Sequence, residues 1–531
     1  MGQGAFAVQI RSGGIRCQNL GFWASGAAEK FPDRPAIIDW ADGRERTFTH
    51  GQLEVRLQRA GAMLSKWGLE PGSRVAIGVG NRAEFIEAFF GAMRAGLVPV
   101  PLNLRQGRIH LTHAIVDSNC AAAIIEPGAN QHLPDIIDEC RLTRRVAVGA
   151  SLPRWQDYKA LIADAPASFD ATVPRPDQAA FIAYTSGSTG KPKGVVLTHA
   201  GQLWWINTFQ RLYPTDPAER SLVAVPLYHK NAMAGVVKTR LPGGASMVLV
   251  PKYEPRAFLQ SLVKYKCTHA TGVPTIYSLA LQERDLITSL DFSGLRSLTV
   301  GSAPVHDPLH RAMEEAFRCR VFQSYGSTEG GPVVIGPPLD GRPVPLGSCG
   351  MLWPGCEAKL VGSQGEEQRR MGELWLRNPG VTPEYKNLPN VNAERLKDGW
   401  LATGDLFEVD DQGFWYFRGR ADDMFDCGGE NVFPKEVEEL LLTHPGVRDA
   451  CVVPAPHASK GQAPVALVVV DPSSALNEGE LKRFCLEQGP AYAHPRRIVM
   501  TDALPLNGAG KVDRAAVRDH MAKILQGVPP S

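Results

Sequence analysis

The amino-acid sequence predicts an α/β fold with additional antiparallel β-structure, in which a large N-terminal domain precedes a small α+β C-terminal domain. Its 531 residues exceed the ~100–200 residues of one typical domain. The first part of the chain alternates short apolar runs with amphipathic stretches, which is typical of layered α/β sheets. Beyond about residue 340, segments rich in Gly and Pro alternate with strand-like runs, which indicates a β-barrel-like antiparallel part.

Individual elements follow from the hydrophobic pattern. Residues 74–79 (RVAIGV) are predicted to form a buried strand, and 84–94 (EFIEAFFGAMR) a helix with apolar residues at i, i+3 and i+4. Gly96 ends that helix, and LVPVPLN follows as the next strand. Five further apolar runs are candidate strands: 121–126, 179–184, 221–225, 246–250 and 296–300.

The C-terminal part has a different pattern. GELWLRNPG and GFWYFRGR alternate in a strand-like way, which predicts antiparallel sheet. A helix is predicted at 434–442 (PKEVEELLL) and a strand at 463–470 (APVALVVV). We therefore expect a large domain at 1–420 and a small domain at 421–531.

Composition excludes several classes of protein. The net charge is +2, from 57 basic and 55 acidic side chains, so nothing favours nucleic acid or stable membrane insertion. None of the ten cysteines forms a C-x-x-C pair, which fits free thiols in a reducing cytoplasm. The N-terminus lacks the apolar core of a signal peptide, and no apolar run approaches the ~20 residues of a membrane span. We expect a cytoplasmic protein.

The strongest local motif is YTSGSTGKPKG, residues 184–194, directly after a predicted strand. Glycines let such a loop approach a ligand closely, hydroxyl groups donate hydrogen bonds to phosphate oxygens, and lysines add positive charge. A flexible Ser/Gly surface loop is the alternative, but the lysines and the preceding strand favour phosphate binding. The spacing excludes a Walker A loop, because only two residues separate Gly187 from Gly190.

This loop resembles the signature of the adenylate-forming superfamily, which includes acyl- and aryl-CoA ligases, peptide-synthetase adenylation domains and beetle luciferases. Further blocks of the same family follow in the family's order. They are VAIGVGNRAEFIEAFFGAMRAGLVPVPLN, SYGSTEG, GWLATGD, GRADDMFDCGGENVFPKEVE and PLNGAGKVDR. The resemblance therefore covers residues 75 to 514, and it is closest to stand-alone acid–CoA ligases of the coumarate, benzoate or fatty acid type.

The resemblance implies a two-step reaction. A carboxylic acid and ATP give acyl-AMP and pyrophosphate; the small domain then rotates about Asp422, and the thiol of coenzyme A attacks the acyl group. The resemblance implies ATP and CoA as co-substrates and Mg²⁺ as the cofactor. The expected partners are therefore small molecules, and a homodimer stays open as the oligomeric state. An aryl or hydroxycinnamate-like acid and a medium- or long-chain fatty acid both stay open. So do the loading of a carrier protein and, more remotely, luciferase-like chemistry or a silent acyl-binding relative.

The resemblance also assigns roles to individual residues. Tyr325 would stack on adenine, Asp405 would accept the ribose hydroxyls, and Lys511 would offset negative charge during adenylation. ATP or AMP binding is expected at Thr185, Ser186, Gly187, Ser188, Thr189, Gly190, Lys191, Lys193, Ser302, Ala303, Pro304, Tyr325, Gly326, Asp405 and Arg420. The expected catalytic residues are Lys511, His229, Thr328 and Glu329, with Glu329 also holding the metal. The acyl pocket is expected at His229, Asn231, Met233, Gly235, Gly301 and Ser324, and the CoA channel at Gly428 and Gly429.

Overall fold

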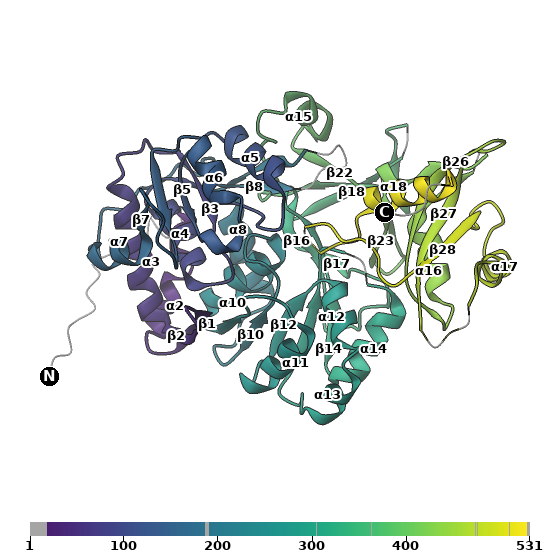
Figure 1. Ribbon diagram of the computed structural model, residues 1–531, viewed down its shortest axis with the longest axis horizontal. Coiled ribbons are helices and arrows are strands. Elements are labelled where there is room, and N and C mark those ends of the chain that lie inside the picture. Colours follow the sequence, from purple (N-terminus) through teal and green to yellow (C-terminus); the bar gives the residue numbers. More distant parts are fainter. Residues whose placement is uncertain are drawn as a thin grey trace.

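The computed structural model contains a parallel sheet, a second and mostly parallel sheet, an antiparallel region and a C-terminal unit (Figure 1). The described residues are 18–185, 191–303, 305–362, 364–428, 430–472, 474, 476–508 and 510–527. Within them, the predicted α/β fold with additional antiparallel strands is confirmed.

The first sheet is parallel and has five strands in the order β4-β3-β5-β6-β7. Its strands are β3 (Arg74–Gly78), β4 (Val98–Pro101), β5 (Cys120–Ile125), β6 (Arg144–Ala147) and β7 (Gln156–Asp157). The helices of this part are α2 (Ser25–Lys30), α3 (His50–Ser65), α4 (Ala83–Arg94), α5 (Arg108–Asp117), α6 (Leu133–Glu139) and α7 (Tyr158–Asp164). The strand predicted at 74–79 and the helix predicted at 84–94 thus correspond to β3 and α4.

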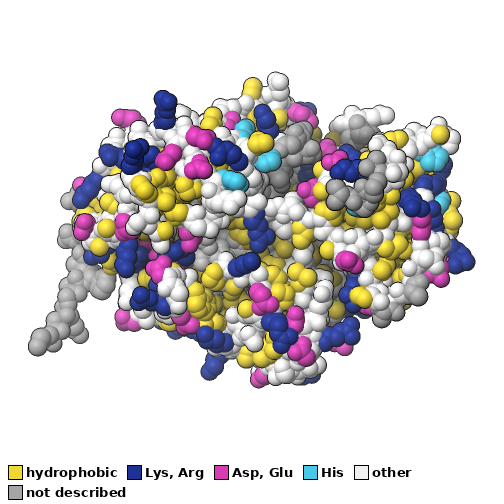
Figure 2. Space-filling model, in the orientation of Figure 1, with side chains coloured by type: hydrophobic (Ala, Val, Ile, Leu, Met, Phe, Trp, Pro, Cys, Tyr) yellow, Lys and Arg dark blue, Asp and Glu magenta, His cyan; other side chains and the backbone are white. Residues whose placement is uncertain are grey.

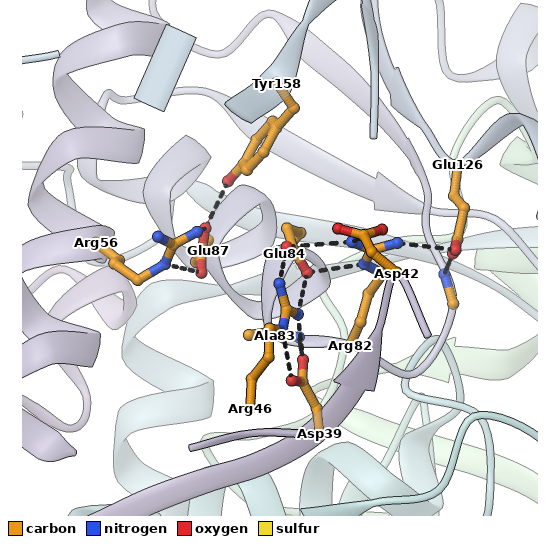
Figure 3. Close-up of polar contacts among 11 residues, drawn as sticks. Asp39, Asp42, Arg46, Arg56, Arg82, Ala83, Glu84, Glu87, Glu126 and Tyr158 are labelled. Carbon is orange, nitrogen blue, oxygen red and sulfur yellow. Dashed lines mark hydrogen bonds and ion pairs between the residues drawn. The ribbon is translucent and has the colours of Figure 1, made fainter. Parts of the chain in front are cut away.

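Helix α4 is buried along its whole length. It is apolar around most of its circumference, as expected for a helix covered on several sides. Its two glutamates, Glu84 and Glu87, are buried, and each pairs with an arginine. Glu84 accepts hydrogen bonds from Arg46 and Arg82, and Arg46 also pairs with Asp39 of strand β1 (Pro35–Ala41) (Figure 3). Because buried charges are costly unless paired, this network ties α4 to the edge of the second sheet.

The second sheet has seven strands in the order β14-β13-β12-β10-β11-β1-β2, all parallel except β2. Its strands are β1 (Pro35–Ala41), β2 (Arg44–Thr49), β10 (Arg220–Val223), β11 (Ser246–Leu249), β12 (His269–Gly272), β13 (Ser297–Val300) and β14 (Arg320–Gln323). The helices of this part are α8 (His199–Leu212), α9 (Lys230–Ala232), α10 (Lys238–Arg240), α11 (Pro255–Lys264), α12 (Pro274–Ala280), α13 (Arg284–Ser289) and α14 (Asp307–Phe317). A π-helical turn, Met233–Val237, joins α9 to α10.

The strand predicted at 179–184 has a different partner from the other N-terminal strands. β8 (Ala179–Thr185) pairs in antiparallel orientation with β9 (Lys193–Thr198), outside both parallel sheets. The register places Thr185 opposite Lys193, at the end of the hairpin where the phosphate-loop motif begins and ends. The hairpin therefore holds the two ends of that motif side by side.

The antiparallel region forms open sheets. A three-stranded sheet consists of β15 (Tyr325–Ser327), β16 (Gly331–Gly336) and β17 (Met351–Leu352). A six-stranded sheet consists of β18 (Glu357–Val361), β19 (Glu367–Gln368), β20 (Met371–Arg377), β21 (Leu396–Lys397), β22 (Trp400–Val409) and β23 (Trp415–Arg420). Helix α15 (Pro389–Arg395) precedes β21. In the described part of the chain these strands do not close into a barrel, so the barrel-like expectation holds only for their antiparallel pairing.

The C-terminal unit lies at the right of Figure 1 and has two hydrophobic clusters of its own. Its sheet consists of β26 (Val447–His457), β27 (Gly461–Val470) and β28 (Arg497–Thr501), preceded by the short hairpin β24 (Phe425–Asp426) and β25 (Asn431–Val432). Its helices are α16 (Pro434–Leu442), α17 (Glu478–Gln488) and α18 (Arg514–Leu525). Helix α16 has the predicted bounds. The loop before α18 extends from this unit toward the centre of the molecule (Figure 1).

Basic and acidic side chains are interspersed over the face shown in Figure 2, which is hollowed between the N-terminal part and the C-terminal unit. No helix within the described ranges is long and apolar enough to span a bilayer. The nine cysteines that the structure describes are all free thiols.

Candidate active site

A cavity of about 1560 Å³ lies where the second sheet, the antiparallel region and the C-terminal unit meet. The predicted site residues that line it are Thr185, Lys193, His229, Asn231, Met233, Ser302, Ala303, Ser324, Tyr325, Gly326, Thr328, Glu329, Asp405, Arg420, Asp422 and Lys511. These residues come from segments up to about 300 positions apart, so the fold brings most of the predicted set together.

The phosphate-loop motif is described at its two ends. Thr185 and Lys193 line the cavity, and the Thr185 hydroxyl donates to a Glu329 carboxylate oxygen at 3.5 Å. Lys191 is exposed and does not belong to the lining. The predictions for Ser186, Gly187, Ser188, Thr189 and Gly190 lie outside the described residues.

The segment after β14 carries a hydroxyl and a carboxylate into the cavity. Thr328 and Glu329 follow β15, and the Glu329 carbonyl accepts the Thr382 N–H at 2.7 Å. Gly326 is required by close packing, because a Cβ there would meet the Pro332 carbonyl oxygen at 2.2 Å. The tight turn therefore fixes where Thr328 and Glu329 point.

Asp405 occupies the centre of a polar cluster. It lies in β22, is 8% exposed, and accepts hydrogen bonds from the Tyr325 hydroxyl at 2.6 Å and from Arg420 at 2.8 Å. Burial, followed by the nearby Asp405 charge, raises the pKa of Tyr325 well above its usual value, so the phenol stays protonated and donates. The Tyr325 ring packs edge-on against Phe407, with ring centroids 4.6 Å apart.

The candidate hinge residue borders the same cluster. Asp422 lies in a single turn of 3₁₀ helix, Ala421–Asp423, directly after β23. Its carboxylate pairs with Arg395 at 3.5 Å and with Arg420 at 3.4 Å. The two arginines thus connect the nucleotide side of the cavity to the start of the C-terminal unit.

Lys511 reaches the cavity on a loop of the C-terminal unit. A β-bridge between Leu506 and Val512 closes this loop, and the Gly510 carbonyl accepts the Thr275 hydroxyl of α12 at 3.3 Å. Burial lowers the pKa of Lys511, and the charges of Asp405 and Glu329 oppose that shift. The ammonium therefore lies within electrostatic reach of both carboxylates.

His229 immediately precedes α9 and faces the same loop. Burial lowers its pKa to about 4, while a hydrogen bond with the Gly508 backbone acts in the opposite direction. The ring is therefore neutral near pH 7. Its Nε2 atom is buried and has no hydrogen-bond partner among the described residues, which leaves it available to a ligand.

The predicted acyl-pocket residues surround α9 and the end of β13. Asn231 donates to the Gly272 carbonyl at 3.2 Å and accepts from Thr271 at 2.7 Å. Asn231 and Gly301 are neighbours, because a Cβ on Gly301 would lie 3.3 Å from the Asn231 amide nitrogen. Met233 and Ser324 line the cavity, whereas Gly235 faces Thr271 and Gly301 is outside the lining.

Two further predictions concern backbone turns. Ser302 lines the cavity with φ +70°, a left-handed conformation that costs a non-glycine residue roughly 1–3 kcal/mol and is often kept at binding sites. Ala303 also lines the cavity, and Pro304 lies outside the described residues.

Gly428, which was predicted to line the CoA channel, has φ +69° and its N–H donates to the Lys460 carbonyl at 3.1 Å. It does not line the cavity in this arrangement. Gly429 lies outside the described residues.

Several cavity residues were not among the predicted site residues. Two are lysines of the segment after β10, the half-buried Lys230 and the buried Lys238. Two others, Arg395 and Arg514, are arginines near the hinge. Lys230 follows the predicted site residue His229, and Arg514 is the last residue of the PLNGAGKVDR block. Both could therefore have been identified as candidates from the sequence. Nothing in the local pattern distinguishes Lys238 or Arg395 from surface residues.

Comparison with known proteins agrees with this arrangement. The AMP-binding enzyme family model matches residues 25–386, and the model of the AMP-binding enzyme C-terminal domain matches residues 436–511. The chain belongs to the AMP-binding enzyme family. This confirms the predicted membership of the adenylate-forming superfamily, and Glu329 and Lys511 of the cavity lining lie within the matched regions.

Named relatives in this family include several acid–CoA ligases. A feruloyl-CoA synthase of Amycolatopsis sp is 34% identical over 511 residues, which cover 95% of this chain and 99% of the relative. A sulfoacetate–CoA ligase of Cupriavidus necator is 31% identical over 496 residues, 93% of this chain and 96% of the relative. The crystal structure of an anthranilate CoA ligase in complex with anthranoyl-AMP matches with a TM-score of 0.87 at 25% identity, covering 96% of this chain and 98% of the other.

Proposed function

We propose that this member of the AMP-binding family is an ATP-dependent acid–CoA ligase. A carboxylic acid and ATP form acyl-AMP and pyrophosphate, and the acyl group then passes to CoA with release of AMP. The observation that carries the proposal is the position of Lys511, which enters from the C-terminal unit beside Asp405 and Glu329 and next to neutral His229. Named CoA ligases among the relatives support the same reaction.

ATP would lie across the end of the β8–β9 hairpin and the Asp405 cluster. Thr185, Lys193 and Thr328 supply donors and charge for the phosphates, as expected for anion-binding loops. Asp405 and Arg420 would bind the ribose, and Tyr325, Ser302 and Ala303 would line the adenine site.

Adenylation brings two anions together. The substrate carboxylate is already ionised near pH 7, so its attack on the α-phosphorus needs no general base. A carboxylate only accepts hydrogen bonds, so neutral His229 would position it in the tautomer that carries the proton on the unpartnered Nε2. Lys511 would stabilise the charge that develops on the transferring phosphoryl group.

Mg²⁺ is the metal that this chemistry implies. The described residues contain no cluster of three or more His, Cys, Asp or Glu side chains able to hold a metal by themselves. The Glu329 carboxylate in the cavity fits Mg²⁺, because this ion is often bound by one or two carboxylates plus substrate phosphates. When bound, Mg²⁺ would neutralise phosphate charge, and Glu329 would hold it.

The second step requires room for a thiol where the Lys511 loop now lies. We propose that residues 421–531 act as a small domain that rotates about Asp422, removing Lys511 and bringing the turn of Gly428 and Gly429 toward the cavity. Hinges are a few residues at element ends that absorb a large backbone change. Asp422 lies in the short turn between β23 and the C-terminal unit.

A direct test measures pyrophosphate release with and without CoA over a panel of acids, together with thioester formation. We expect pyrophosphate in a single turnover without CoA and continuous turnover with CoA. An enzyme that adenylates the acid but forms no CoA thioester would instead indicate the loading of a carrier protein. The panel includes hydroxycinnamates and benzoates, because the relatives act on feruloyl and anthranoyl groups, and fatty acids as the second class.

A further inference from the structure

Two lysines of one helical segment line the cavity: Lys230 is half-buried and Lys238 is buried. Lys230 begins α9 and Lys238 begins α10, about two turns further along, and the π-helical turn Met233–Val237 lies between them. Both side chains line the cavity, as do Asn231 and Met233. The segment therefore presents two cationic groups to the same enclosed space.

The surroundings of Lys238 contain aromatic rings and one uncharged polar side chain, that of Gln202. Its side chain is 3% exposed and its ammonium donates to the Gln202 side-chain oxygen at 2.5 Å. The rings of Phe181 and Trp205 lie 5.3 and 5.6 Å from Nζ, close enough for weak cation–π attraction. Across the described residues, no carboxylate lies within ion-pair distance of Lys238.

Lys230 and Lys238 differ in their electrostatic partners. Lys230 donates to the Gly326 carbonyl and interacts with the charges of Lys511, Glu329 and Asp405, so it belongs to the reacting end of the cavity. The charged group that acts on Lys238 is Lys230, and this interaction is repulsive. Burial and that repulsion lower the pKa of Lys238 to about 7. The cavity lining thus contains, about two helical turns from the reacting end, a buried lysine without an anionic partner among the described residues.

A purely structural role does not account for this arrangement. A buried ammonium without a counter-charge is destabilising, and an apolar residue of similar size at such a position is usually neutral or stabilising. Lys238 and Gln202 are buried, at 3% and 1% exposure, and both belong to the lining of the cavity. Together they offer donors of the type that an anionic group of a ligand accepts.

We infer that the substrate acid carries a second anionic group, which Lys238 and Gln202 bind at the far end of the acyl pocket while the reacting carboxylate lies near His229 and Lys230. This inference rests on the proposed ligase function and narrows its substrate class to dicarboxylic or sulfo-carboxylic acids. The second anionic group of such an acid would be the negatively charged partner that Lys238 lacks. A monoanionic acid of equal length leaves Lys238 buried and unpaired.

The test compares acids that differ only in the distal group. Pyrophosphate release serves as the measure of adenylation. Four pairs of acids are compared: succinate with butyrate, adipate with hexanoate, suberate with octanoate, and terephthalate with benzoate. Sulfopropanoate is also compared with succinate, to distinguish a distal sulfonate from a distal carboxylate. At least one dianionic acid is expected to exceed its monoanionic match in kcat/KM by about ten-fold or more, as one charge-assisted hydrogen bond implies. A preference for the monoanionic acid in every pair overturns the inference.

Two variants locate the effect. Lys238→Met is expected to reverse the preference by lowering kcat/KM for the dianionic acid about ten-fold or more while raising it for the monoanionic match. Lys252→Met, a change at an exposed lysine outside the cavity, is the matched control and is expected to leave both values unchanged. A Lys238→Met enzyme with the wild-type ratio contradicts the inference, and if the variant does not fold, the wild-type ratio still decides. Absence of pyrophosphate with every acid would contradict the ligase proposal itself.

Discussion

The Tyr325 hydroxyl donates a 2.6 Å hydrogen bond to the Asp405 carboxylate, the same group that is proposed to bind the ribose of ATP. Arg420 holds the other carboxylate oxygen at 2.8 Å. Both oxygens are therefore engaged before a nucleotide arrives. Binding of ribose hydroxyls must share or replace these bonds, which gives Tyr325 and Asp405 opposite expected effects on ATP affinity.

Asp405→Ala is expected to raise the KM for ATP by about ten-fold or more. Charge-assisted hydrogen bonds contribute ~1.5–3 kcal/mol each, and the variant also removes the hydrogen bond between Arg420 and Asp405. Tyr325→Phe removes the competing donor and is expected to leave the KM for ATP unchanged or lower. Initial rates over a range of ATP concentrations measure both values. An unchanged KM in Asp405→Ala would remove this residue from the nucleotide site.

Asp422→Pro is expected to preserve adenylation and slow thioester formation by orders of magnitude. Asp422 now lies in a 3₁₀ turn, where φ is near −60°, and proline fixes φ near −65°, so the substitution favours the present arrangement at this residue. The preceding residue, Ala421, also becomes restricted. The measurement is the decay of enzyme-bound acyl-AMP after CoA is added.

The matched control for the hinge is Asp422→Ala. This variant removes the contacts with Arg395 and Arg420 but leaves the backbone free to rotate. Its thioester formation should stay within a few-fold of wild type, since exposed ion pairs contribute ~0–1 kcal/mol. Decay of acyl-AMP at the wild-type rate in Asp422→Pro would show that the pivot lies elsewhere.

Stability is expected to fall as the pH drops from about 6.5 toward about 4, in part because of His199. Its buried ring accepts the Leu20 N–H at 3.0 Å, and burial lowers its pKa from 6.5 to about 4. A folded-state pKa below the unfolded value means that the unfolded chain binds the proton more tightly, so stability is present above pH 6.5 and lost on acidification. The loss from this residue is about 3 kcal/mol over that window.

His199→Asn isolates this contribution, because its amide oxygen can accept the Leu20 N–H but does not titrate. The fall in Tm between pH 7.5 and pH 5 should be smaller in the variant than in wild type. His520→Asn, at a partly exposed position of α18, serves as the control. Parallel Tm profiles for wild type and His199→Asn would contradict the assignment.

Sequence patterns predicted the positions of individual strands and helices better than they predicted which strands pair with one another. The apolar run at 179–184 gave β8, but periodicity does not reveal that its neighbour is antiparallel β9 rather than a parallel strand. The alternation beyond residue 340 gave antiparallel strands, yet their closure depends on twist and register, and they form open sheets. Burial patterns specify which face of a strand packs inward, not which strand lies beside it.

The site shows the same limit. Motif blocks placed Thr185, Glu329, Asp405 and Lys511, and the fold brings these residues to one cavity. Lys238 carried no signal, since a lysine is usually exposed and its burial arises from packing against distant α8. Residues whose role depends on contacts across the sequence were invisible to local patterns.

The measurement that tests the central claim most directly is single-turnover analysis of Lys511→Ala in both half-reactions. If the Lys511 loop completes the adenylation site, acyl-AMP formation should slow by roughly 10²–10³-fold, the effect of removing one preorganised charge-stabilising donor. Thioester formation from supplied acyl-AMP should stay within a few-fold of wild type, and Lys523→Ala, an exposed change in α18, should affect neither step. Equal loss of both half-reactions, or adenylation at the wild-type rate, would contradict the claim.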